Sequence, residues 1–253
     1  MWEIYDTLIE AVPADSTVRR CVCGLHWLAV CSEGMGLAMT PREGEPCLEQ
    51  AGGYAGMRTR DLARAVKSWN FHEAGLGLAA INSALNAGTP FEAATGLCPR
   101  QLPDEDIFTY LFEEFRGRKV AVIGHFRNLD KLQPICDLTI LERRPQCGDL
   151  PDPACECVLP EQDYVVITAT TLINKTLPRL IELSRNARVV LAGPSTPLTP
   201  KLFDFGIDIL AGLVVEDEER IWTVVQEGGQ RQIFGPGSRM VKVGRENGAR
   251  RAG

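Results

Sequence analysis

Two side chains that suit proton transfer stand where short apolar runs end: His125 after Val120–Ile123, and Glu142 after Leu138–Leu141. Imidazole titrates near neutral pH and serves as an acid, a base or a metal ligand, and a carboxylate at a strand end often holds a ribose hydroxyl. We interpret His125 and Glu142 as a pair for proton transfer or metal ligation. The alternatives are an ordinary loop histidine and an ion pair between Glu142 and the arginines that follow it.

Four hydrogen-bonding side chains follow a third apolar run, Tyr164–Thr168; they are Thr170, Thr171, Asn174 and Lys175. The β-branched residues of that run suit a strand buried on both faces of a parallel sheet, and ligands bind beyond the carboxyl ends of such strands. A single threonine is enough to cap a following helix, so the number of polar groups favours ligand contact. Lys175 would neutralise an anionic ligand.

A fourth run, Val189–Ala192, leads into the sequence Gly-Pro-Ser-Thr-Pro. The two prolines stiffen this loop and hold two hydroxyls at the edge of the sheet. We interpret Ser195 and Thr196 as ligand contacts, with a helix cap as the alternative for Ser195. A nucleophile elbow is not indicated, because the pattern G-x-S-x-G is absent.

Glycines that end or follow these strands would let a ligand approach the backbone closely; they are Gly124, Gly193 and Gly212. A dinucleotide-binding fold would place G-x-G-x-x-G after the first strand. His125 and Phe126 stand there instead of small residues, which disfavours NAD. Asn82 is a polar residue in an otherwise apolar helical segment and is interpreted as facing the ligand, with a buried asparagine bonded to backbone as the alternative.

The order of predicted helices and strands, which must position these residues, changes near residue 100. The first part predicts a helix over 2–12, strands within 16–40, and helices over 59–69 and 71–86, which together form an α+β unit. Gly88 is expected to be the C′ residue of the second of these two helices. From Lys119, five apolar runs alternate with helix-length segments, which predicts a doubly wound parallel sheet. We therefore expect an α+β domain over 1–100, with a linker over 94–103, an α/β domain over 101–240 and a disordered tail over 241–253.

Several helix boundaries are predicted from capping residues. Asp104 and Asp217 are expected to be N-caps, and Thr199-Pro200 is expected to begin a helix as N-cap and first residue. The segment between Glu142 and Gln162 holds four prolines, so it is expected to form only a short turn.

The amino-acid composition limits the classes of protein to which this chain can belong. The chain has 253 residues, 45% of them hydrophobic and 24% charged, and a net charge of -6, which argues against coating nucleic acid. No apolar run approaches the length of a membrane span, so the cytoplasm is the default location and no membrane partner is expected. The nine cysteines are expected to be free thiols. The sequence contains no zinc-binding pattern. Cys147, Cys155 and Cys157 share one loop, so a site for a soft metal is an alternative to ordinary free thiols there.

Five stretches resemble the "putative heavy-metal chelation" family of bacterial and archaeal proteins. They are GLGLAAINSALN at 75–86, VIGHF at 122–126, LTILERRPQCGDLPD at 138–152, DYVVITATTLINKTLPRLIEL at 163–183 and VVLAGPSTPLTPKLFDFGIDILAG at 189–212. The resemblance implies an N-terminal domain similar to the enolase N-terminal fold, a Rossmann-like second domain and a site between them. The activity of that family is itself inferred, so the resemblance informs the fold more than the chemistry.

The function best supported by the sequence is binding of a small anionic or metal-chelating ligand in a cleft between the two domains. The cofactor is unknown, with a divalent or heavy-metal ion as the candidate, and both catalysis and homo-oligomer formation are left open. One alternative is an enzyme that uses a nucleotide-type cofactor, S-adenosylmethionine or NAD, on the Rossmann-like half. The other is a metal carrier that uses the cysteines.

Overall fold

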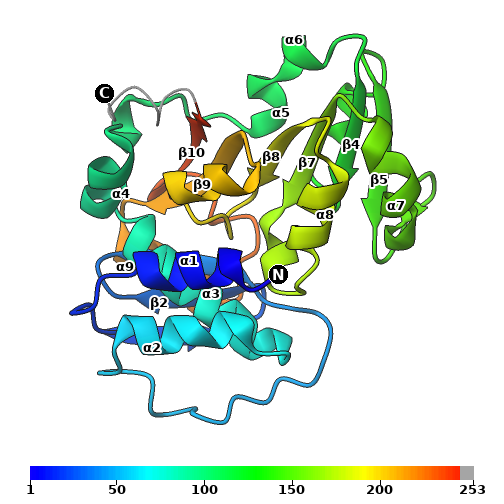
Figure 1. The fold of residues 1–253 in the computed structure, drawn as a ribbon. Coiled ribbons are helices and arrows are strands. Elements are labelled where there is room, and N and C mark those ends of the chain that lie inside the picture. The colour runs from blue at the N-terminus through cyan, green and yellow to red at the C-terminus, as the bar shows by residue number, and fades with distance from the viewer. Residues whose placement is uncertain (246–253) are drawn as a thin grey trace.

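The protein has the mixed α/β fold that the sequence predicts, built around two β-sheets (Figure 1). The structure, a computed structural model, describes residues 1–245. The larger sheet has seven strands and the smaller, N-terminal sheet has three. Residues 246–253 of the predicted tail lie outside the described residues, whereas residues 241–244 belong to the last strand.

The larger sheet is parallel except for its last strand, β10, which runs antiparallel at one edge, and its order is β10-β9-β8-β7-β4-β5-β6. Four of the five predicted apolar runs lie in strands, and the fifth, 207–210, overlaps the start of β9. Two further strands escaped prediction, because β6 is only two residues long and β10 lies in a Gly/Arg-rich segment. The strands are β4 (Lys119–Ile123), β5 (Asp137–Glu142), β6 (Leu150–Pro151), β7 (Tyr164–Thr168), β8 (Arg188–Ala192), β9 (Ile209–Val215) and β10 (Ser238–Gly244).

The two faces of the larger sheet are covered by different helices. On one face, apolar side chains of α5 (Ile107–Tyr110) and α6 (Phe112–Phe115) pack on β4, β7, β8 and β9. The other face carries α8 (Leu177–Leu183) and the 3-10 helix Pro200–Phe205. A short helix α7 (Cys155–Val158) lies in the proline-rich segment. The sheet is therefore enclosed on both sides, as its nearly continuous apolar strands require.

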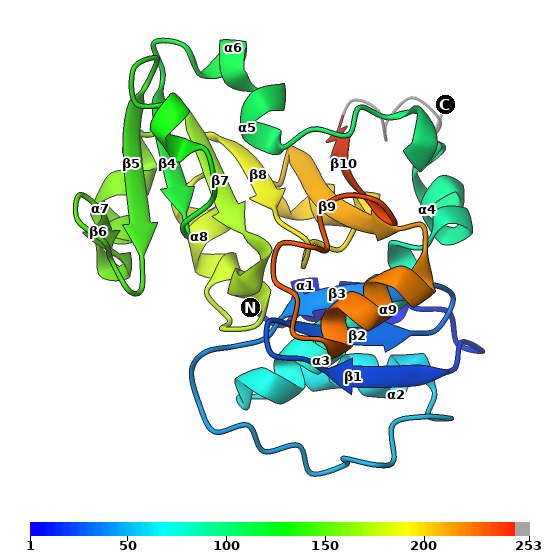
Figure 2. The ribbon, with the colours of Figure 1, turned by 180° about the vertical axis from the view of Figure 1, so that it is seen from behind.

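The smaller sheet is an antiparallel meander of β1 (Arg20–Cys23), β2 (Trp27–Cys31) and β3 (Met35–Met39). The buried helix α3 (Phe71–Leu85) covers one face of it, and α9 (Glu218–Gln226), from the far end of the chain, covers the other (Figure 2). The remaining helices of this part are α1 (Glu3–Ala11), α2 (Thr59–Ala63) and α4 (Gly88–Thr95).

Two predicted helix boundaries are wrong, and a third has the predicted position but a different helix type. Gly88 does not terminate α3 but is the first residue of α4, which occupies part of the predicted linker. Asp106, not Asp104, caps α5 by accepting from the N–H groups of Phe108 and Thr109, while Asp104 accepts from the N–H of Met240. Pro200 begins a 3-10 helix without a side-chain cap from the preceding threonine.

The predicted cap of α9 is confirmed, because Asp217 accepts from the N–H of Arg220. Among residues 1–245, none of the helices combines the length and the apolarity that crossing a bilayer requires.

The two sheets are joined by a continuous core that contains residues of α1, α3 and the larger sheet. The arrowheads of β4, β5 and β7 point toward the N-terminal part (Figure 2). The carboxyl ends of the parallel strands, where the sequence places the candidate ligand groups, therefore face the N-terminal part.

Candidate functional site

The strand order of the larger sheet reverses between β4 and β7, because the chain passes from β4 to β5 on one side and returns to β7 on the other. Ligands of open α/β sheets bind at such a point. The register places Ile123 opposite Ile167, so Gly124 and Thr168 are neighbours at the carboxyl edge. A Cβ at Gly124 would lie 2.9 Å from Cγ2 of Thr168. Only a residue without a side chain fits there, and at a φ of 94° glycine is also favoured by the backbone.

Phe126 extends over the ends of two strands. One edge of its ring lies 3.9 Å from where a Cβ of Gly124 would be, and the other lies 3.9 Å from the same position at Gly193. The ring also makes an edge-to-face contact with Phe108, with centroids 5.3 Å apart. Two of the three predicted glycines thus meet under one aromatic side chain.

His125 is oriented by a carboxylate. Its Nδ1 lies 3.3 Å from Oδ2 of Asp149, whose side chain is only 3% exposed, while the imidazole itself is 37% exposed. The Asp149 carboxylate is held in turn by the N–H of Gln146. Because Nδ1 faces Asp149, Nε2 is the ring atom that is left to meet a ligand.

Glu142 is bonded to the backbone. Its Oε2 accepts from the N–H of His125 at 3.0 Å, and its Oε1 accepts from the N–H of Arg143 at 2.8 Å. The carboxylate therefore ties the loop after β4 to the loop after β5. It positions His125 through the main chain, which is a different arrangement from the side-chain pair that the sequence suggested.

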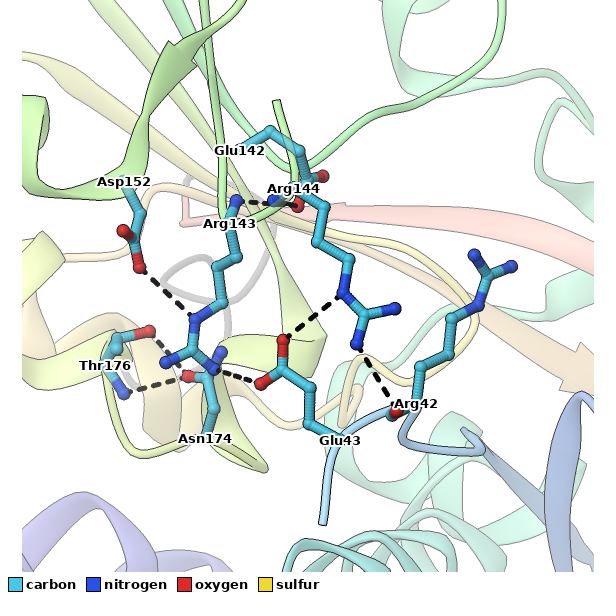
Figure 3. A network of polar contacts seen from close by, with 8 residues as sticks. All are labelled: Arg42, Glu43, Glu142, Arg143, Arg144, Asp152, Asn174 and Thr176. Atoms are coloured by element: carbon cyan, nitrogen blue, oxygen red, sulfur yellow. Dashed lines mark hydrogen bonds and ion pairs between the residues drawn. The ribbon is translucent and has the colours of Figure 1, made fainter. Parts of the chain in front are cut away.

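Three arginines gather beside this loop (Figure 3). Arg143 donates to Glu43 of the N-terminal part at 3.0 Å and to Asp152 at 3.2 Å, and Arg144 lies 3.8 Å from the same Glu43. Among residues 1–245, the guanidinium of Arg42 has no ion-pair partner. The sequence analysis did not single out Arg42 or Glu43, because both lie in a Gly/Pro-rich segment without regular structure.

Of the four polar residues predicted after β7, three make hydrogen bonds within local turns, and the fourth, Lys175, is buried in the interior. Thr170 Oγ1 lies 3.1 Å from Thr168 Oγ1, and Thr171 Oγ1 donates to the Thr168 carbonyl at 2.6 Å. Asn174 Oδ1 accepts from the N–H and the hydroxyl of Thr176 (Figure 3). Thr170 and Asn174 are half-buried, whereas Thr171 is buried.

Lys175 is buried against α1. Its Nζ donates to the carbonyl of Ile173 at 2.6 Å and lies 5.8 Å from the centroid of the Tyr5 ring. No carboxylate within residues 1–245 pairs with it, and burial lowers its pKa from 10.5 to about 8. Its φ of 68° is unusual for a residue with a side chain. Lys175 is thus an uncompensated charge at the contact between the two parts of the molecule.

The stability of the protein should therefore depend on pH through Lys175. Below pH 8 the side chain is charged in the folded and unfolded states, and its burial is unfavourable. Between about pH 8 and 10.5 the folded state has released the proton and the unfolded state has not, so wild type should gain up to about 3 kcal/mol over Lys175→Met as pH rises. Denaturant unfolding at pH 7.5 and pH 10 measures this difference. Lys201→Met, at an exposed lysine, controls for the lost charge. The prediction is contradicted if the free energies of unfolding of wild type and Lys175→Met differ by the same amount at both pH values.

Ser195, Thr196 and Asn82 lie in the contact between the two parts. Ser195 Oγ accepts from the N–H of Met39 at 2.9 Å, and Asn82 Nδ2 donates to the carbonyls of Leu37 and Ser195. All three predicted residues are buried, and neither Thr196 Oγ1 nor Asn82 Oδ1 has a partner in residues 1–245. They lie where the N-terminal part contacts the larger sheet, and the hydrogen bonds of Ser195 and Asn82 are made to buried main-chain groups.

Gly212 is also a packing residue. It lies within β9, and a Cβ there would come within 2.9 Å of both the Leu198 side chain and the Thr196 carbonyl.

Asn86, which was not predicted as a site residue, joins the end of α3 to the larger sheet and the loop before it. Its Oδ1 accepts from the N–H of Leu198 at 2.8 Å, and its Nδ2 donates to the carbonyls of Thr196 and Leu213. The spacing from Asn82 is four residues, which puts both amides on one face of α3. That spacing was a signal in the sequence for a pair of interface asparagines.

A bare metal ion does not fit the donor groups as they are arranged. Within residues 1–245, no three His, Cys, Asp or Glu side chains come close enough to hold an ion together. In particular, Cys155 is buried while Cys147 and Cys157 are exposed, and the three thiols do not assemble into a site. The carboxylates nearest His125 are already bonded to backbone N–H groups.

Comparison with known proteins agrees with the resemblance. Two family models, both described as "Putative heavy-metal chelation", match residues 106–243 and 5–85, and the first alone spans more than half of the chain. The chain belongs to this family. A curated relative, an uncharacterized protein of Methanocaldococcus jannaschii, is 26% identical over 214 residues, which is 80% of this chain and 78% of the relative.

Two solved structures of family members are similar throughout. A protein of unknown function from Desulfitobacterium hafniense has a TM-score of 0.88 and 41% identity, with 96% of this chain and 98% of that chain covered. A protein of unknown function from Pyrococcus horikoshii has a TM-score of 0.78 and 21% identity, with 95% and 98% covered, and shows the common fold.

Proposed function

We propose that this family member binds a small anionic ligand, of the kind that chelates metals, at the carboxyl edge of the larger sheet. The observation that carries the proposal is that the His125–Asp149 pair and the two arginines Arg143 and Arg144 lie in the loops after β4 and β5, next to the point where the strand order reverses. Arg42 lies next to them, because its carbonyl accepts from Arg144. Guanidinium groups bind carboxylates and phosphates in a bidentate manner. A metal would arrive within the chelate, as cargo, with Nε2 of His125 available to complete its coordination.

The family description associates these domains with heavy metals, whereas the described residues lack a cluster that would hold an ion by itself. Binding of a chelate satisfies both observations, because the small molecule supplies most of the ligands. Exposed groups at the site are compatible with a ligand that enters from solvent. A hollow of about 390 Å³ lies elsewhere, at the amino edge of the sheet near Pro178 and Asp208, and includes no predicted site residue.

His125→Ala should reduce the affinity for citrate and for the nickel–citrate complex at least about tenfold, because a hydrogen bond to a charged group contributes about 1.5–3 kcal/mol. Isothermal titration calorimetry measures the affinities, and thermal unfolding should show an unchanged folded state. His26→Ala, at the turn between β1 and β2, is the matched control. Equal affinities for His125→Ala and wild type, or a wild type that binds neither probe, would contradict the proposal.

A second function, use of a nucleotide-type cofactor, is favoured by one observation. If β4 is counted as the first parallel strand, the order of the six parallel strands is 3-2-1-4-5-6, which is also the order of dinucleotide-binding sheets. His125 and Phe126 occupy positions that a pyrophosphate would need. Stabilisation against heating by NAD or S-adenosylmethionine, but not by citrate, would favour this alternative over the first.

A further inference from the structure

The carboxylate of Glu43 occupies the position that an anionic ligand would take between two arginines. Glu43 Oε2 lies 3.0 Å from Nη1 of Arg143, and Oε1 lies 3.8 Å from Nε of Arg144 (Figure 3). Each oxygen thus faces a different guanidinium group, as the two oxygens of a bound carboxylate would. The side chain comes from the N-terminal part, whereas both arginines follow β5 of the larger sheet.

The contact is built so that it can open. Glu43, Arg143 and Arg144 have side chains that are 38%, 38% and 59% exposed, and ion pairs in such positions contribute little to stability. The residue after Glu43 is Gly44, which has a φ of 84° and no neighbouring atom within 4 Å of a Cβ position. By contrast, Pro41, on the other side, lies against Gly75 of α3. Glu43 can therefore turn away while the preceding chain stays anchored.

The charges near Glu43 favour exchange for a ligand. Arg42, Arg143 and Arg144 carry three positive charges, and Glu43, Asp152 and Glu142 carry three negative charges, so the network without Glu43 has an excess positive charge. Removing Glu43 leaves Arg144 without an ion-pair partner within residues 1–245 and leaves Arg143 paired only with Asp152. Arg42 is exposed and has no ion-pair partner within the same residues, and its carbonyl accepts from Arg144.

We propose that Glu43 is an internal substitute for the ligand: a carboxylate or phosphate of the incoming molecule displaces it from Arg143 and Arg144 and thereby releases the segment that begins at Gly44. This proposal rests on the proposed function, and it assigns the anion-binding end of that ligand to two named arginines. The ligand class is a compound with at least one carboxylate or phosphate group.

Glu43→Gln should bind citrate about threefold more tightly than wild type, the factor expected when one exposed competing ion pair is removed. Glu45→Gln removes the same charge from the same segment at an exposed position with no ion pair within residues 1–245, and should show no comparable gain. Arg144→Gln should bind more weakly than wild type, and Glu43→Gln should gain less in the Arg144→Gln background than alone. Calorimetric titration with citrate and with inorganic phosphate measures all four variants.

The outcomes separate this inference from the proposed function. If wild type binds citrate or phosphate, and Glu43→Gln and Glu45→Gln have equal affinities, the displacement of Glu43 is refuted while the proposed function stands. If neither wild type nor Glu43→Gln binds either anion, both are refuted. If Glu43→Gln binds and wild type does so only weakly, both are supported.

Discussion

Gly36→Ala is expected to lower the free energy of unfolding by at least about 3 kcal/mol, because it forces a methyl group into main-chain atoms that cannot move aside. Gly36 lies in β3 against α3. A Cβ there would overlap the backbone nitrogen of Ser83 and the carbonyl oxygen of Ala79, and would lie 2.5 Å from the carbonyl carbon of Asn82. In a protein of this size the loss corresponds to a decrease in melting temperature of roughly 6–12 °C.

Gly88→Ala is the matched control for this substitution. No atom lies within 4 Å of a Cβ position at Gly88, and its φ is not positive. Its free energy of unfolding should stay within about 0.5 kcal/mol of wild type. Calorimetric melting of both variants measures the effect, and a Gly36→Ala protein as stable as Gly88→Ala would show that β3 does not lie as close to α3 as described.

Asn86→Ala should lower the free energy of unfolding by about 3–5 kcal/mol, because it leaves three buried main-chain groups without hydrogen-bond partners. Each such group costs about 1–3 kcal/mol if the surrounding structure does not adjust. Those groups are the N–H of Leu198 and the carbonyls of Thr196 and Leu213. Asn86→Asp keeps the acceptor for Leu198 but turns a carboxylate toward two carbonyl oxygens, so it should be at least as destabilising. Urea denaturation of the purified variants gives these values.

Asn186→Ala controls for loss of an asparagine. Asn186 is exposed after α8, and its side chain forms no hydrogen bond to residues 1–245. It should unfold at nearly the wild-type urea concentration. An Asn86→Asp protein with wild-type stability would contradict the assignment of the amide nitrogen as donor to Thr196 and Leu213.

The large-scale fold was predictable because its signals are local and strong. The runs at Val120–Ile123 and Tyr164–Thr168 are apolar on both faces, and the residues between them have helical length. The predicted helix over 71–86 agrees with α3 to within one residue, but the role given to Gly88 depended on that glycine alone, and Gly88 instead begins α4. The C-cap is Asn86, whose side chain accepts from the N–H of Leu198. A residue that serves tertiary contacts carries no local sign of where a helix ends.

The candidate site was predictable only in part. His125 and Glu142 do come together, because the register of β4 and β5 aligns Ile123 with Leu141. The partners that give them their roles could not be seen: Asp149 orients His125 from across a loop, and Glu142 binds the main chain. Asn82 and Ser195 do lie near one another, but the amide nitrogen of Asn82 and the hydroxyl of Ser195 bond to main-chain groups.

The position of α9 has a consequence for how the chain is made. The smaller sheet is formed by residues 20–39, yet one of its faces is covered by Ile221, Val225 and Ile233, near the other end of the sequence. During synthesis on the ribosome, that apolar face has no cover until residues 218–233, about 180 residues after the sheet, have emerged. Newly made chains must therefore keep the first sheet unfinished, or shielded by chaperones, until α9 is available.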